Sequence, residues 1–120
     1  TNLSSINFGS DFDTSKVTTM IAMFSLCKKL SYIDLSEFNT SNVTNMQSMF
    51  YQCRRLEDLN LGSFDTSKLT TINYIFNNCI SLKNLDIRNA ELSKVQSKIV
   101  PMELRIQQQY MLKIVLKKNI

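Results

Sequence analysis

The 120-residue sequence predicts an α/β solenoid, with a parallel sheet on one face, helices on the other face and a helical cap at its C-terminal end. A unit of about 26 residues recurs along the chain, and apolar residues occupy the same positions in successive units. The spacing of these apolar residues changes halfway through each unit. One strand and one helix in so short a unit cannot bury their own apolar faces, so the units are expected to stack.

The repeat is clearest between residues 30–55 and 56–81, which share leucine, phenylalanine, threonine, serine and cysteine in register. Residues 3–29 follow the same pattern with one extra residue. Residues 82–94 begin a fourth copy in which Ala90 replaces the phenylalanine. Such columns of matched residues are the sequence signature of a repeat architecture.

The first part of each unit is predicted to be a strand. In the second unit Leu30, Ile33 and Leu35 are apolar. The residues that flank Ile33 and Leu35, at positions 32, 34 and 36, are polar. This alternation is typical of a strand with one buried face. The polar side chains are therefore expected to point to the open face of the sheet.

The second part of each unit is predicted to be a helix. In the second unit the apolar residues there recur at intervals of three or four, which is the spacing of one helical face: Val43, Met46, Met49, Phe50 and Cys53. Short polar side chains at residues 39–41 precede this run and are suited to cap a helix N-terminus. Residues 13–15 and 65–67 are expected to do the same in the first and third units.

The combined motif, LxxLDLSxF-D/N-T-S-x-V-T-x-M-x-x-MF-x-x-C, resembles the repeat of BspA-type leucine-rich-repeat bacterial surface proteins. Surface lipoproteins of mycoplasmas and Gram-positive bacteria carry similar units. The resemblance covers roughly residues 3–95, although residues 71–75 depart from the usual helix motif. It implies a leucine-rich-repeat-like solenoid, extracellular or on the cell surface, that contacts a protein of a host or neighbouring cell. It brings no catalytic residues.

Charge and composition exclude several functions. The net charge is +4, and the excess lies in the C-terminal tail, whereas a nucleic-acid-binding domain is expected to carry a basic stripe on its body. No uncharged apolar stretch approaches the roughly 18 residues of a membrane helix, so membrane contact is expected only through an anchor outside this sequence. The chain has no histidine, no glycine-rich phosphate loop and no nucleophile elbow. We therefore expect a non-enzymatic protein without a cofactor.

The candidate partner-binding site is the set of polar side chains on the open sheet face: Tyr32, Asp34, Asp58, Asn60, Asn84, Asp86 and Arg88. Solenoid proteins commonly bind protein partners on such a surface. The alternative is a solvated face whose polar residues follow from strand alternation alone. Asp34, Asp58 and Asp86 also suggest a calcium site, but they lack the dense spacing of a calcium loop, so no metal is expected.

The cysteines at positions 27, 53 and 79 occupy equivalent places at the ends of the predicted helices. Stacked positions lie about 5 Å apart, which permits a disulfide. Each cysteine ends an apolar face, however, and Cys27, Cys53 and Cys79 are predicted to be inert buried thiols. Without histidine or a close cysteine pair, a zinc site is not expected.

The two ends of the chain are predicted to differ. Residues 1–95 form the repeat array, and residues 96–120 are expected to cap it with an amphipathic helix from Pro101; binding to a membrane surface or partner helix is the alternative. The basic pairs Lys28–Lys29 and Arg54–Arg55 are expected to complement helix dipoles. Little precedes the first unit, so its exposed edge suggests either a piece of a longer array or a homo-oligomer that pairs through this edge. The alternative function is a structural element that self-assembles through this open N-terminal coil.

Overall fold

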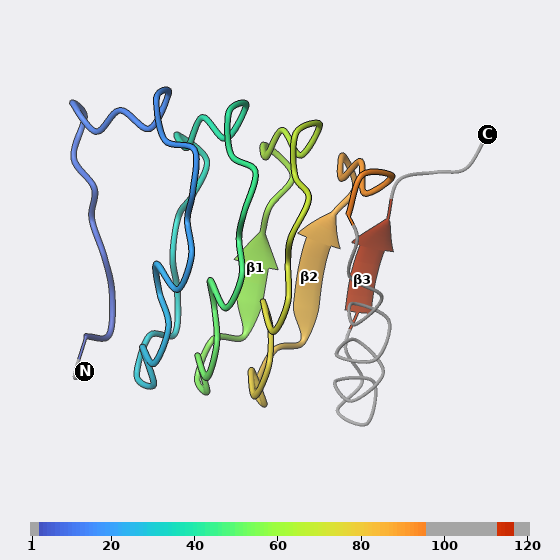
Figure 1. The fold of residues 1–120 in the computed structure, drawn as a ribbon. Helices are drawn as coiled ribbons and strands as arrows, with labels where there is room; N and C mark the ends of the chain where they lie inside the picture. Colours follow the sequence, from blue (N-terminus) through green and yellow to red (C-terminus); the bar gives the residue numbers. More distant parts are fainter. Residues whose placement is uncertain (1–2, 96–112, 117–120) are drawn as a thin grey trace.

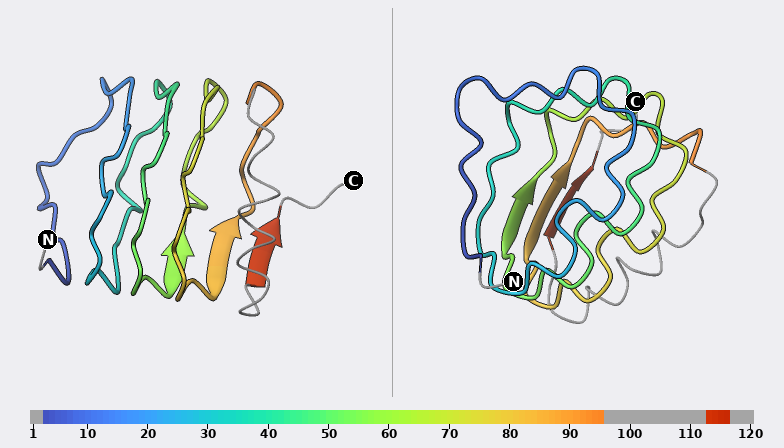
Figure 2. Two further views of the ribbon diagram at one scale, coloured as in Figure 1. Left: turned by 60° about the horizontal axis from the view of Figure 1, so that its bottom comes forward. Right: turned by 60° about the vertical axis from the view of Figure 1, so that its left-hand side comes forward.

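The computed structural model describes residues 3–95 and 113–116, and in these residues the chain winds into successive coils that stack side by side (Figure 1). The sheet contains β1 (Asp58–Asn60), β2 (Asn84–Ile87) and β3 (Lys113–Leu116), all parallel and in the order β1-β2-β3. The coils comprise residues 3–29, 30–55, 56–81 and 82–95, which we number one to four. Strands lie on one side of the stack and turn-rich segments on another (Figure 2).

The prediction of an α/β solenoid with a helical cap is wrong, because the described residues contain no helix. Part of the predicted cap is the strand β3, which pairs with β2. Residues 96–112 and 117–120, including the predicted helix start at Pro101, lie outside the described residues. The segments predicted as helices in the first three coils are runs of turns instead.

These turns replace helical hydrogen bonding with bonds between coils. The backbone N–H groups of Ser48, Phe50 and Gln52 donate to carbonyls of the third coil, at N···O distances of 2.8, 3.0 and 2.7 Å. Isolated parallel bridges join Thr19 to Asn45 and Asn45 to Thr71 on the same side. A neighbouring coil therefore supplies the acceptors that an α-helix would find within its own segment.

Each run of turns contains two non-glycine residues with positive φ, four positions apart. In the second coil these are Ser48 (φ 56°) and Gln52 (φ 58°), each the third residue of a turn closed by an i→i+3 hydrogen bond. Glycine usually occupies such a position, and another residue there costs about 1–2 kcal/mol. The equivalent positions of the other coils behave alike: Ala22, Leu26, Tyr74 and Asn78. The bonds between coils offset this strain.

The core is built from columns of identical or similar side chains. Leu30, Leu56 and Leu82 are each fully buried. Phe24, Phe50 and Phe76 stack with ring centroids 5.6 and 6.0 Å apart. Each coil buries its apolar residues against the next coil, so the core runs continuously along the stack.

A column of buried threonines ties successive coils together. The Thr40 hydroxyl, 1% exposed, donates to the Asp65 carbonyl at 3.0 Å and accepts the Asp65 N–H at 2.8 Å. Thr14 binds the backbone of Asn39 in the same way, and Thr66 binds that of Glu91. The residues predicted to cap helices therefore cross-link coils.

The acidic or amide residue beside each of these threonines makes a local turn. The side-chain oxygens of Asp13, Asn39 and Asp65 accept the backbone N–H of the serine two residues later, at 2.9, 3.1 and 2.9 Å. The sequence signal for a helix start therefore marks a turn at a corner of each coil.

Candidate interaction surface on the sheet face

A hollow of about 360 Å³ opens on the sheet side of the second, third and fourth coils. Nearly all of the residues proposed from the sequence line it: Tyr32, Asp34, Asp58, Asn60, Asn84 and Asp86. Strand register places them in rows, because Asp58 pairs with Asn84 and Asn60 pairs with Asp86. Arg88 does not line the hollow, although its side chain contacts Asp86.

The hollow lies where hydrogen bonding between coils is interrupted. Within the part of the chain that the structure describes, no backbone hydrogen bond joins residues 32–36 to β1. The strand β1 is therefore an edge of the sheet on this side, while the turn sides of the same coils are bonded together. The buried side chains of Ile33, Leu35 and Leu59 lie behind the polar rim.

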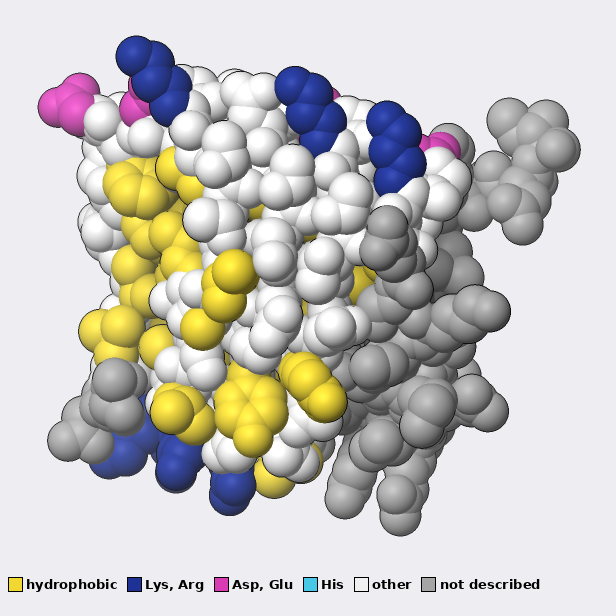
Figure 3. Space-filling model, viewed as in Figure 1, with side chains coloured by type: hydrophobic (Ala, Val, Ile, Leu, Met, Phe, Trp, Pro, Cys, Tyr) yellow, Lys and Arg dark blue, Asp and Glu magenta, His cyan; other side chains and the backbone are white. Residues whose placement is uncertain are grey.

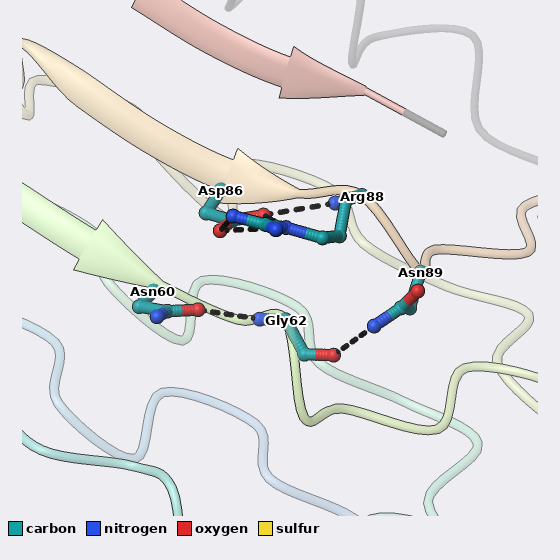
Figure 4. A network of polar contacts seen from close by, with 5 residues as sticks. All are labelled: Asn60, Gly62, Asp86, Arg88 and Asn89. Atoms are coloured by element: carbon teal, nitrogen blue, oxygen red, sulfur yellow. Dashed lines mark hydrogen bonds and ion pairs between the residues drawn. The ribbon is translucent and has the colours of Figure 1, made fainter. Parts of the chain in front are cut away.

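Three of the proposed residues also stabilise the backbone where the strand segments end. The side-chain oxygens of Asp34, Asn60 and Asp86 accept the N–H two residues later, at 3.0, 2.8 and 3.1 Å. Figure 4 shows the contact between Asn60 and Gly62. This turn-forming role was not predicted from the sequence, although the Asn-x-Gly spacing at residues 60–62 is typical of it.

Hydrogen bonds set the charge of this surface. The Ser36 side chain and backbone N–H hold the pKa of Asp34 below its ordinary value, so this carboxylate stays ionised. Asp86 is bound by the Arg88 guanidinium through Nε and Nη2, which lowers the pKa of Asp86 and raises that of Arg88 (Figure 4). Asp58 accepts a hydrogen bond from the Asn84 amide. The unneutralised charge of the hollow therefore belongs to Asp34 and Asp58.

Tyr32 is the most exposed large side chain of this surface, at 62%. Its hydroxyl has no hydrogen bond to any residue that the structure describes. A tyrosine that presents an apolar ring and a polar tip at the rim of a hollow is a frequent anchor in protein interfaces. The geometry thus brings one aromatic group, three carboxylates and two side-chain amides together around one hollow.

Comparison with known proteins places the chain in a family. The family described as "Mycoplasma protein of unknown function, DUF285" matches residues 2–108. This chain belongs to that family. No curated protein and no solved structure matches it.

In this DUF285 chain the carboxylates of the sheet face do not gather around a metal position. Among residues 3–95 and 113–116, no group of three or more cysteine or acidic side chains could hold an ion. The Asp58 carboxylate accepts a hydrogen bond from the Asn84 amide, and the Asp86 carboxylate forms a salt bridge with Arg88. The calcium alternative therefore gains no support from the described residues.

The three cysteines of the DUF285 chain are buried thiols in one column. The Cys53 and Cys79 thiols donate to the carbonyls of Phe24 and Phe50, at 3.1 and 3.0 Å. Burial raises the pKa of the Cys53 thiol to about 12. A thiol of this kind is a poor nucleophile at neutral pH, so the column is suited to packing rather than to chemistry.

The basic pairs of the DUF285 chain do not follow helices, contrary to the prediction. All four are exposed and lie in turns, and the described part of the chain has no helix whose dipole they could complement: Lys28, Lys29, Arg54 and Arg55. Figure 3 shows lysine and arginine side chains along two opposite margins of the turn side. No described helix is long and apolar enough to cross a membrane.

Proposed function

We propose that this chain is a non-enzymatic interaction module of a BspA-like surface or secreted protein, and that it binds a protein partner through its sheet face. The proposed localisation rests on the resemblance of the repeat motif to BspA-type surface proteins, with which the match to a mycoplasma family is compatible. The observation that carries the binding role is the shared hollow lined by Tyr32, Asp34, Asp58, Asn60, Asn84 and Asp86.

Partner capture tests this proposal. The purified chain is incubated with biotinylated surface proteins of host cells, and the triple variant Tyr32→Ala/Asp58→Ala/Asn84→Ala is compared with it. Tyr74→Ala is the matched control, because Tyr74 is 47% exposed but lies on the turn side. Capture that survives the triple substitution, with both variants folded, would contradict the assignment of this face.

Localisation needs a separate experiment. Intact cells that produce the protein are treated with a protease that cannot enter them, and the chain is then detected with an antibody. Rapid loss of the chain, with a cytosolic marker preserved, supports a surface position. Complete protection of the chain on intact cells, with cleavage after lysis, argues against it.

Self-assembly through the first coil is the second candidate, and one observation favours it. Met23 of the first coil is 40% exposed, whereas the equivalent Met49 is fully buried by its neighbouring coil. Ile21 and Leu26 are also exposed, and hydrophobic side chains gather over this coil in Figure 3. Sedimentation at several protein concentrations tests this second candidate. Association of the original chain that is abolished by Met23→Lys supports stacking through the first coil. A chain that is monomeric at every concentration excludes self-assembly.

A further inference from the structure

A second hollow, of about 400 Å³, lies between the first and second coils. Its wall contains three phenylalanines and two acidic residues: Phe8, Phe12, Phe38, Asp34 and Glu37. It adjoins the sheet-face hollow, because Asp34 lines both. This pocket was not among the sites predicted from the sequence.

The pocket lies where few backbone hydrogen bonds join the first coil to the second. The first unit has one extra residue near Gly9, and Gly9 has a positive φ of 75°. Within the described residues, only the bond from Ser31 N–H to the Ser4 carbonyl, at 3.3 Å, joins the backbones of residues 3–9 and 30–36. A side chain added at Gly9 would meet no atom within 4 Å, so the space beside it is open.

The phenylalanines form a packed aromatic wall. The Phe8 ring centroid lies 4.7 Å from that of Phe12 and 4.9 Å from that of Phe38. Phe38 is buried, while Phe8 and Phe12 are half-buried and leave part of their rings open to the pocket. An aromatic face of this kind attracts a cation that approaches within about 6 Å.

The two carboxylates give the pocket a negative charge that the protein does not neutralise. No lysine or arginine lines it, and Glu37 has no hydrogen bond or ion pair with any described residue. One Asp34 oxygen accepts the Ser36 N–H. The Ser36 side chain also hydrogen-bonds the Asp34 carboxylate. The acceptors that a ligand could use are therefore the Glu37 carboxylate and the remaining lone pairs of Asp34.

We propose that this pocket binds an arginine side chain of the protein partner. A guanidinium stacks its flat face on an aromatic ring and directs its N–H groups at carboxylates in the same plane. A quaternary ammonium has no N–H for the carboxylates, and a lysine ammonium lacks the flat face. The inference rests on the proposed function, since it names one chemical feature of the partner.

Peptide titration tests the pocket independently of partner capture. The probe is N-acetyl-Gly-Arg-Gly-amide, added to the ¹⁵N-labelled chain, with citrulline and lysine peptides for comparison. We expect amide shifts at Gly9, Asp34 and Glu37 with the arginine peptide, and binding up to about fivefold weaker with either other peptide. Equal binding of the citrulline peptide would overturn the charge argument, and equal binding of the lysine peptide would overturn the choice of arginine.

Two substitutions locate the site. Glu37→Gln should weaken binding about fivefold, whereas Glu57→Gln, which removes the same charge outside the pocket, should leave it unchanged. Phe12→Leu should also weaken it, provided that the variant folds. Unchanged affinity in Glu37→Gln refutes the site even if Phe12→Leu does not fold. Failure of partner capture with intact peptide binding would refute the proposed function alone.

Discussion

Thr40→Val is expected to destabilise the stack by removing one hydroxyl that joins two coils. Valine keeps the size and branching of threonine, but it leaves the N–H and carbonyl of Asp65 without the partner that now lies 2.8 and 3.0 Å away. Leaving a buried polar group unsatisfied costs about 1–3 kcal/mol. Since Asp65 itself is exposed and water can replace part of the lost bonding, we expect a loss of about 2–3 kcal/mol for the two groups together.

Thr40→Ser is the matched control, because serine keeps both hydrogen bonds and loses one methyl group, at about 1 kcal/mol. Urea denaturation of the three proteins gives their free energies of unfolding. Valine should be the less stable variant by about 1–2 kcal/mol. A valine variant as stable as the serine variant would show that the threonine column does not hold the coils together.

Three further predictions concern other columns. Cys53 should not react with a thiol reagent at pH 8 until the chain unfolds, because burial raises the pKa of its thiol to about 12, and rapid native-state labelling would contradict its packing. Ala90→Val should raise the free energy of unfolding by about 1 kcal/mol, since a cavity of about 40 Å³ lies beside Ala90 and the added methyl groups can fill it. A variant less stable than the original chain would show that the cavity has no room for the larger side chain. Stability should fall as the pH drops below the ordinary carboxyl range, because the folded-state pKa of Asp34 is lowered and the folded chain binds fewer protons there than the unfolded chain. Asp34→Asn should reduce the difference between urea midpoints at pH 7 and pH 3, and an unchanged difference would contradict the role of its hydrogen bonds.

Strand alternation in the sequence indicates which side chains face outward. Ile33 and Leu35 are buried as their spacing requires, whereas Tyr32 before them and Asp34 between them are exposed on the open side. The offset between matched residues also equals the strand register, in which Asp58 faces Asn84. These features depend on local periodicity, so one sequence is enough to predict them.

The helices were predicted wrongly because their apolar spacing has two structural solutions. Met46, Met49, Phe50 and Cys53 are buried, but the backbone that buries them bonds to the neighbouring coil. That partner lies about 26 residues away and is invisible to a local reading. The threonine, asparagine and serine content of these segments, which favours turns over helix, was the available signal.

The aromatic pocket could not be predicted for a related reason. Phe8, Phe12 and Phe38 all look like core residues in the sequence, but they line a pocket beside Gly9, where a single described backbone hydrogen bond joins residues 3–9 to residues 30–36. The effect of one inserted residue on stacking depends on how the whole coil adjusts. Local sequence patterns therefore do not predict where such a pocket forms.

Photo-crosslinking from the sheet face tests the central claim most directly. A benzoylphenylalanine is placed at residue 32, or at residue 74 as the control, and each protein is irradiated in the presence of host-cell surface proteins. Both positions hold exposed tyrosines, but only Tyr32 lines the sheet-face hollow. The account predicts a discrete crosslinked partner from position 32 and none from position 74. Crosslinking from position 74 alone would contradict it.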